Sequence, residues 1–244
     1  MIKRQTGQIH NNYAKQHLAD SKKLDSDDLS DKLKETFQFI LFDLYGYSQS
    51  DEHIAKTPDR VTNLWLSTMK YGILKQQLKQ KYKTYNTYRK ILLEHIAQEC
   101  KVTTFSLHND GQTKQSGWLK VYPISVYGWC AHHIAPMFGH VLIAYKPTEN
   151  IIGLSKLPRI AKFVAKQLMV QEEYTHELIG IVREFLGENT PVIAVTKFRH
   201  LCMEMRGVEE TSSVTVYSAG VNLKSPYEQE LLYDFEKLLD NIPV

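Results

Sequence analysis

The first hundred residues place apolar side chains at helical spacing. An apolar stripe over residues 30–46 predicts one helix with a single buried face. A second helix is predicted at Lys56-Thr57-Pro58-Asp59, because Thr57 suits an N-cap and Pro58 the first helical turn. Gly72 is a typical residue just after a helix end, and residues 74–99 are predicted to continue the helical region.

Beyond residue 101 the pattern changes to β-branched and alternating runs, which predict strands. These runs are 102–107, 118–127, 139–145, 191–195 and 214–217. Asn109-Asp110-Gly111 predicts a turn between the first two strands. A long helical stretch is predicted over about 157–187, ended by Gly187, and a last helix begins at Ser225-Pro226. Because strands and helices come in separate groups, the order predicts an α+β fold rather than alternating βαβ units.

Composition narrows the class of protein. The 244 residues are 43% hydrophobic and 23% charged, which is typical of a globular chain with its own core. The net charge of +3 is weak for a nucleic-acid binder, so we expect no nucleic-acid partner. No apolar run approaches the roughly 18 residues of a membrane span, and residues 1–32 lack the apolar stretch of a secretory signal. Three cysteines indicate a reducing, cytoplasmic location rather than a disulfide framework.

Cysteine and histidine side chains offer a candidate metal site. Cys130 and His133 form a C-x-x-H pair, and Cys202 lies two residues after a histidine. Two thiolates and one imidazole would leave a fourth tetrahedral position open for water, as in catalytic zinc sites. On spacing alone, the alternative is a pair of buried, inert thiols.

A second group of residues suits an anionic nucleotide. Cations gather near a predicted helix start at Ser155, and they are Lys156, Arg159, Lys162 and Arg206. Cations beside unpaired backbone N–H groups suit a phosphate chain, although a solvated basic helix face is a common alternative. The neighbouring Gln171 and Glu172 offer an amide and a carboxylate that match the edge of a guanine base, or they are ordinary surface residues.

Together these motifs resemble those of the GTP cyclohydrolase I family, whose reaction opens pterin biosynthesis. The matching stretches are Lys56-Thr57-Pro58-Asp59-Arg60, Cys130-Ala131-His132-His133, Gly153-Leu154-Ser155-Lys156-Leu157-Pro158-Arg159-Ile160, Val170-Gln171-Glu172, His200-Leu201-Cys202-Met203 and Met205-Arg206-Gly207-Val208. The resemblance covers about residues 54–221. Each motif is short, but their order and separations are specific in combination.

The resemblance implies a zinc-dependent reaction on GTP. It implies that Zn²⁺ is held by Cys130, His133 and Cys202 and activates water for attack on C8 of the guanine ring. C8 would leave as formate, and the ribose carbons would rearrange to give 7,8-dihydroneopterin triphosphate. Repeated proton transfers need general acids and bases. The implied catalytic residues are His132, His200 and Ser155.

The resemblance also assigns substrate contacts and a fold. The implied substrate-binding residues are Gln171 and Glu172 for guanine, Lys156, Arg159 and Arg206 for the triphosphate, Arg60 reaching in from a neighbouring subunit, and Leu154. The implied fold is the tunnelling fold (T-fold), an antiparallel sheet with helices on one face. Copies of the chain would close a ring-shaped barrel, and two stacked pentamers would make a homodecamer. Residues 1–50 are expected to form a polar arm and a helical extension, and 51–244 the catalytic domain.

Three positions depart from the family pattern. Ala131 stands where the family has a glutamate beside the metal ligand. Pro123 stands where an aspartate is usual, and because proline cannot donate to a sheet ladder, we expect this strand to be re-routed or to lie at an edge. The run Thr215–Asn222 replaces a threonine-rich segment.

These departures keep two alternatives open. One is a non-catalytic or specialised relative that binds a guanine nucleotide or pterin. The other is a T-fold enzyme like the nitrile reductase of queuosine synthesis, which uses a catalytic cysteine and no zinc. The pathway that would use the product (folate, biopterin or deazaguanine synthesis) and any regulatory partner protein are left open by the sequence.

Overall fold

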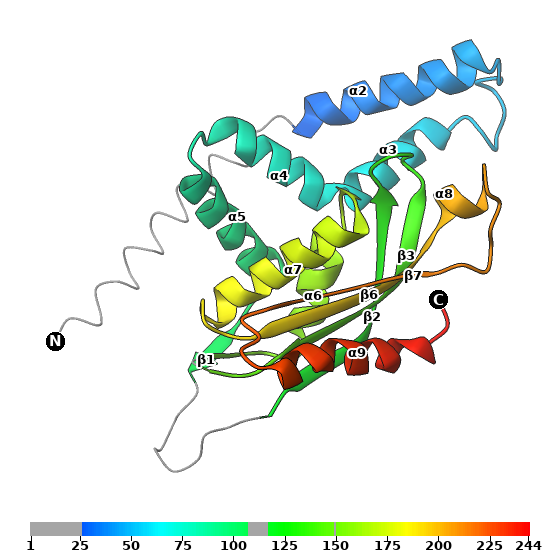
Figure 1. Cartoon of the computed structure of the whole chain (residues 1–244). Coiled ribbons are helices and arrows are strands. Elements are labelled where there is room, and N and C mark those ends of the chain that lie inside the picture. Colours follow the sequence, from blue (N-terminus) through cyan, green and yellow to red (C-terminus); the bar gives the residue numbers. More distant parts are fainter. Residues whose placement is uncertain (1–25, 107–116, 149) are drawn as a thin grey trace. The chain divides into compact units, whose positions relative to one another are not determined.

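The computed structural model describes residues 26–106, 117–148 and 150–244 (Figure 1). The polar arm expected before residue 26 and the turn expected at Asn109-Asp110-Gly111 lie outside these residues. The chain divides into two compact units, 1–95 and 96–244. The expected domain boundary between residues 50 and 51 stays a prediction.

The described part of the first unit is helical. Its elements are α2 (Ser26–Gln38), the π-helical turn η1 (Phe39–Leu44), α3 (Thr57–Thr68), α4 (Lys70–Lys81) and most of α5 (Tyr85–Glu99). An ion pair of 2.6 Å between Lys34 and Asp59 joins α2 to α3. The predicted helix at Pro58 is confirmed, with Lys56 rather than Thr57 at the N-cap.

The prediction that Gly72 follows a helix end is wrong. Gly72 lies inside α4, and α3 ends at Thr68 with the Met69 N–H bonded to the Trp65 carbonyl. A single glycine costs a helix only about 1 kcal/mol relative to alanine, so helix-forming neighbours carry the helix through it.

The second unit is built on a five-stranded sheet in the order β5-β2-β3-β6-β7. Its strands are β2 (Leu119–Cys130), β3 (Pro136–Tyr145), β5 (Leu168–Met169), β6 (Val192–His200) and β7 (Thr215–Val221). All neighbours are antiparallel except β5, which runs parallel to the end of β2. The predicted strands are confirmed, and the unit is α+β.

The pairing of the first strand differs from the prediction. β1 (Thr104–Ser106) pairs with β4 (Asn150–Ile152) in a separate two-stranded sheet, not with β2 as a hairpin. Local turn residues indicate that the chain reverses, but they do not fix which strand becomes the partner. That choice depends on contacts between residues far apart in the sequence.

The predicted long helix over 157–187 is two helices, α6 (Lys156–Val164) and α7 (Gln171–Leu186). The short strand β5 separates them and pairs with Trp129 and Cys130 of β2. The predicted ends are confirmed. Gly187 follows α7 with a left-handed φ of 114°, and the Ser225 hydroxyl accepts a hydrogen bond from the Glu228 N–H at the start of α9 (Pro226–Asp240).

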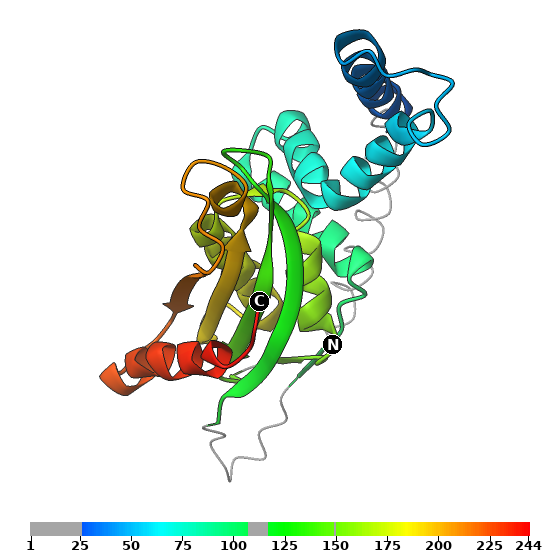
Figure 2. The ribbon, with the colours of Figure 1, turned by 90° about the vertical axis from the view of Figure 1, so that its right-hand side faces the viewer.

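Helices cover both faces of the sheet, so the expectation of helices on one face is wrong. Thr196 of β6 contacts α7, whereas its neighbour Val195 belongs to a core cluster with Phe235 and Leu239 of α9. Adjacent residues of a strand point to opposite faces. Figures 1 and 2 show α9, in red, on one side of the sheet and α6 and α7 on the other. The central strands are apolar on both faces, which allows both faces to be covered.

Pro123 lies where β2 has one partner strand. The pairing of β2 with β3 shifts register between Val121 and Ile124, and β5 pairs with β2 at Trp129 and Cys130, beyond this point of the strand. The missing N–H of proline is therefore tolerated at an edge, as expected. The strand itself continues to Cys130.

Candidate active site

The end of β2 and the start of β3 form a tight reversal that presents two histidines. The Cys130 N–H donates to the Ala135 carbonyl at 2.8 Å, and the Ile134 N–H donates to the Cys130 carbonyl at 2.9 Å. His132 and His133 are exposed between these bonds, with ring centroids 6.1 Å apart. The Ala131 N–H donates to the Met169 carbonyl of β5, which ties the reversal to the sheet.

Strand register brings Cys202 to this reversal. Met137 near the start of β3 pairs with His200, the last residue of β6, and α8 (Leu201–Glu204) follows at once. The ligand atoms of Cys130, His133 and Cys202 all lie within 4.8 Å of one another. Cys130 Sγ lies 3.6 Å from His133 Nδ1.

This arrangement fits a zinc ion. With metal–ligand bonds of about 2.0 to 2.3 Å, adjacent ligands of a tetrahedral zinc lie about 3.5 to 3.8 Å apart. The 3.6 Å between Cys130 Sγ and His133 Nδ1 falls in this range, and Cys202 Sγ lies within 4.8 Å of both. Burial raises the pKa of the Cys202 thiol, and hydrogen bonding to Cys130 raises it further. Both thiols must lose their protons to bind a metal, so metal binding here is coupled to proton release.

His200 lies in a hydrogen-bonded network with α7 and β7. Its Nε2 lies 3.0 Å from Gln171 Oε1 and 2.8 Å from Thr215 Oγ1. Burial lowers the pKa of His200, and the nearby carboxylate of Glu172 opposes that shift. The structure therefore brings His200 together with both residues of the predicted guanine pair. Gln171 is buried, whereas Glu172 is exposed in the first turn of α7.

The predicted phosphate-binding residues lie on several elements. Ser155 is the N-cap of α6, Lys156 is its first residue, and Arg159 lies exposed one turn later. Leu154 just before them is 59% exposed. Arg206 is exposed after α8, and its charge partly opposes the rise that burial causes in the pKa of the Cys202 thiol. Arg60 lies exposed on α3 in the first unit, so its role in reaching the phosphates stays a prediction.

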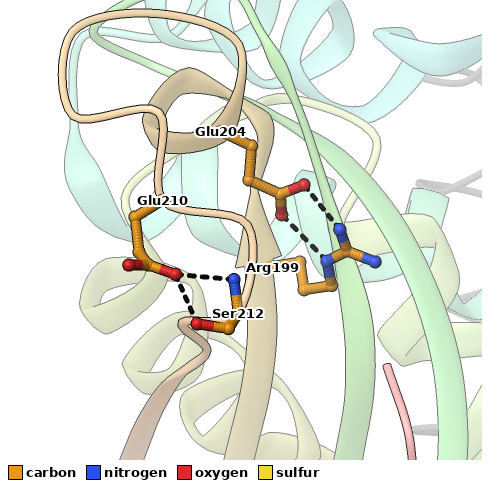
Figure 3. Close-up of polar contacts among 4 residues, drawn as sticks. All are labelled: Arg199, Glu204, Glu210 and Ser212. Carbon is orange, nitrogen blue, oxygen red and sulfur yellow. Dashed lines mark hydrogen bonds and ion pairs between the residues drawn. The ribbon is translucent and has the colours of Figure 1, made fainter.

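An ion pair that the sequence analysis missed supports the turn that carries Cys202. Arg199 Nε and Nη2 donate to the two carboxylate oxygens of Glu204 at 2.8 and 2.5 Å, as Figure 3 shows. The guanidinium also lies 5.7 Å from the ring centroid of Phe138. Because Arg199 is the next-to-last residue of β6 and Glu204 is the last residue of α8, the pair closes the corner around His200 and Cys202.

A second contact in Figure 3 orders the segment after α8. Glu210 accepts hydrogen bonds from the N–H (2.7 Å) and the hydroxyl of Ser212, and the Glu210 N–H donates to the Met203 carbonyl at 3.2 Å. The chain that carries Arg206 therefore leaves α8 and returns to it within seven residues. No sequence motif marks either carboxylate.

Comparison with known proteins identifies the family. Residues 83–230 match the family model of GTP cyclohydrolase I. A GTP cyclohydrolase 1 from Flavobacterium johnsoniae is 30% identical over 85% of this chain and 82% of its own length. The chain belongs to the GTP cyclohydrolase I family.

Other relatives in the family are similar over shorter stretches. A GTP cyclohydrolase 1 from Campylobacter lari is 41% identical over 43% of this chain, and that match covers 56% of the relative. One from Latilactobacillus sakei is 37% identical over 55% of this chain and 71% of the relative. These modest identities are consistent with a divergent member, and the mixed sheet with its helices fits the T-fold of the family. Within the described residues, no helix combines the length and apolar character needed to cross a membrane.

Proposed function

We propose that this protein converts GTP to 7,8-dihydroneopterin triphosphate and formate, with Zn²⁺ held by Cys130, His133 and Cys202. The observation that carries the proposal is the convergence of these three ligand atoms within 4.8 Å of one another. Cys202 follows two residues after His200, whose ring interacts with the Glu172 carboxylate. Held by these two thiolates and one imidazole, zinc would act as a Lewis acid that makes water a stronger nucleophile near neutral pH.

The remaining residues bind the substrate and move protons. The exposed Glu172 carboxylate accepts N–H bonds from the guanine edge, and the Leu154 side chain packs beside the substrate. The triphosphate is bound by Lys156, Arg159 and Arg206, and by Arg60 of a neighbouring subunit. His132 and His200 transfer protons during ring opening and closure, assisted by the Ser155 hydroxyl.

Assembly belongs to the same proposal. In the second unit the outer side of β7 has no partner strand among the described residues, and Val216 on it is 42% exposed. An open strand edge favours pairing with another chain. We expect ring-shaped pentamers that stack into a decamer, a cytoplasmic location, and use of the product in folate, biopterin or deazaguanine synthesis.

The deciding experiment incubates the purified, zinc-loaded protein with GTP. After oxidation, the amount of neopterin, measured by its fluorescence, should equal the amount of formate released. Binding of GTP and zinc without either product would contradict the proposal. That result would favour a nucleotide-binding relative, the alternative that Ala131 suggests because it lacks a carboxylate beside the metal ligand.

A further inference from the structure

All hydrogen-bonding groups of the Gln171 side chain are bonded to other residues of the protein. It is 5% exposed, and its Nε2 donates to the Thr196 carbonyl at 3.1 Å, to the Thr215 carbonyl at 3.2 Å and to Thr196 Oγ1 at 3.0 Å. Its Oε1 contacts His200 Nε2 at 3.0 Å and accepts from Thr215 Oγ1. A primary amide has two N–H donors and one acceptor oxygen, so no group is left to bind a base.

Backbone carbonyls fix which way this amide points. The carbonyl oxygens of Thr196 and Thr215 can only accept, so they require the amino group of Gln171 on their side. The reverse orientation would point Oε1 at two other oxygens and leave buried acceptors without donors, which is unfavourable. Oε1 is thereby directed at His200.

The fixed amide determines the proton position on His200. Because Oε1 only accepts, the ring nitrogen 3.0 Å away must carry a hydrogen, which makes Nε2 the protonated nitrogen. Thr215 Oγ1, at 2.8 Å, accepts from the same N–H and directs its own hydrogen to Oε1. A neutral imidazole protonated on Nε2 has its lone pair on Nδ1.

We infer that Gln171 and Thr215 are positioning residues that hold His200 as the Nε2–H tautomer, which leaves Nδ1 as the atom that accepts a proton. The side chain of Gln171 does not bind the guanine edge. The exposed carboxylate of Glu172, the next residue, binds it instead. The role of His200 Nδ1 as a proton acceptor in catalysis rests on the proposed function. The tautomer itself follows from α7, β6 and β7 meeting at these three side chains.

Steady-state kinetics with GTP tests the inference on the zinc-loaded protein. Thr215→Val removes one hydroxyl and should lower kcat about 10- to 100-fold, a part of what general acid–base groups contribute, while KM for GTP changes by less than about 3-fold. Thr215→Ser restores the hydroxyl and should recover most of kcat. Gln171→Met should also act on kcat rather than on KM.

A matched control separates positioning from general loss of stability. Thr190 is a fully buried threonine whose hydroxyl bonds Thr148 Oγ1 at 2.7 Å. It follows the far end of α7, a helix of 16 residues and so about 24 Å long. Thr190→Val should lower the melting temperature as Thr215→Val does, but leave kcat within about 2-fold of the original protein.

Nitrogen NMR measures the tautomer of His200 directly, without relying on enzymatic activity. In sedimented, zinc-loaded protein labelled with ¹⁵N-histidine, the His200 signal, identified by its loss in His200→Ala, should show a protonated Nε2 and an unprotonated Nδ1. In Thr215→Val or Gln171→Met the signal should change to a mixture of tautomers. If Gln171→Met does not fold, Thr215→Val decides the question.

Two results would overturn the inference. One is a protonated Nδ1 on His200 in the original protein. The other is a Gln171→Met variant whose KM for GTP rises 10-fold or more at unchanged kcat, because that is the signature of a lost substrate contact. A protein that forms no neopterin at all contradicts the proposed function instead, and the NMR result still decides the tautomer.

Discussion

The side chains of the candidate metal cluster come from two separate parts of the second unit. The metal cluster needs Cys130 and His133 from one reversal and Cys202 from the turn after β6. Each ligand of the cluster can therefore be replaced separately. Replacement of Cys100 provides the control, because this third cysteine is buried outside the cluster.

Cys130→Ser and Cys202→Ser should each lose zinc and neopterin formation together, since two remaining ligands hold zinc far more weakly than three. Metal analysis of the purified variants and the fluorescence assay measure the two effects. Cys100→Ala should keep a full complement of zinc. Full activity in either serine variant would show that the metal is held elsewhere.

Glu172→Gln should weaken GTP binding about 10- to 100-fold, because hydrogen bonds to a charged group contribute about 1.5 to 3 kcal/mol. Zinc content should stay unchanged, since Glu172 is not part of the cluster. Isothermal titration with GTP and metal analysis provide the two measurements. Glu173→Gln, which changes the adjacent exposed carboxylate, should bind GTP normally; equal losses in both variants would argue against a specific contact.

At the scale of elements, short contacts hold the ends of two helices in place. The Arg199–Glu204 pair closes the corner between β6 and α8, and Glu228 holds the start of α9. Glu228 accepts from the Lys224 N–H at 2.7 Å and from Lys146 Nζ at 3.1 Å. We expect different effects from disturbing the two carboxylates. Loss of the partner of Glu204 should weaken the metal site, whereas loss of the charge of Glu228 should change the pH dependence of stability.

Arg199→Met should lower zinc affinity about 10-fold and reduce the free energy of unfolding by about 2 kcal/mol, because it leaves the mostly buried Glu204 carboxylate without its partner. Competition with a chelator and chemical denaturation measure the two quantities. The exposed pair of Lys32 and Asp28 provides the comparison, since Lys32→Met should change stability by less than about 1 kcal/mol. Unchanged zinc affinity in Arg199→Met would show that α8 keeps its place without the ion pair.

Glu228 predicts a pH dependence of stability. Hydrogen bonding to the Lys224 N–H holds the pKa of Glu228 below its ordinary value in the folded protein. The stabilisation is therefore fully present above the pKa of the unfolded chain and is lost as the pH falls through the lower, folded pKa. Thermal unfolding between pH 7 and pH 3 should show a smaller acid-dependent loss in Glu228→Gln than in the original protein. The exposed Glu230 should give no such difference when changed to glutamine.

At the scale of the whole molecule, the proposed decamer has a definite mass. Ten chains of 28.3 kDa give about 283 kDa, which native mass spectrometry can measure. Val216→Lys places a charge on the open edge strand β7 and should shift the protein to smaller species, because charges on an edge oppose strand pairing. Tyr233→Lys, on the exposed side of α9, should keep the mass of the original protein. A monomeric original protein would contradict the proposed assembly.

The sequence by itself determined most of the helices and strands, the end of α7, the start of α9, and the residues of the metal cluster. These follow from local periodicity, from caps such as Ser225 and Gly187, and from motifs whose order is specific. A local pattern predicts the secondary structure that a segment prefers, because that preference depends on residues close together in the chain.

Only the tertiary structure decided which segments meet. It paired β1 with β4, divided the helical stretch at β5, covered the second face of the sheet with α9, and turned Gln171 inward toward His200. Each of these outcomes depends on contacts between residues distant in sequence, where burial and the pairing of buried polar groups outweigh local preference. For Gln171 this means that the neighbouring Thr196, His200 and Thr215, and not the Gln-Glu motif, decide what its amide binds.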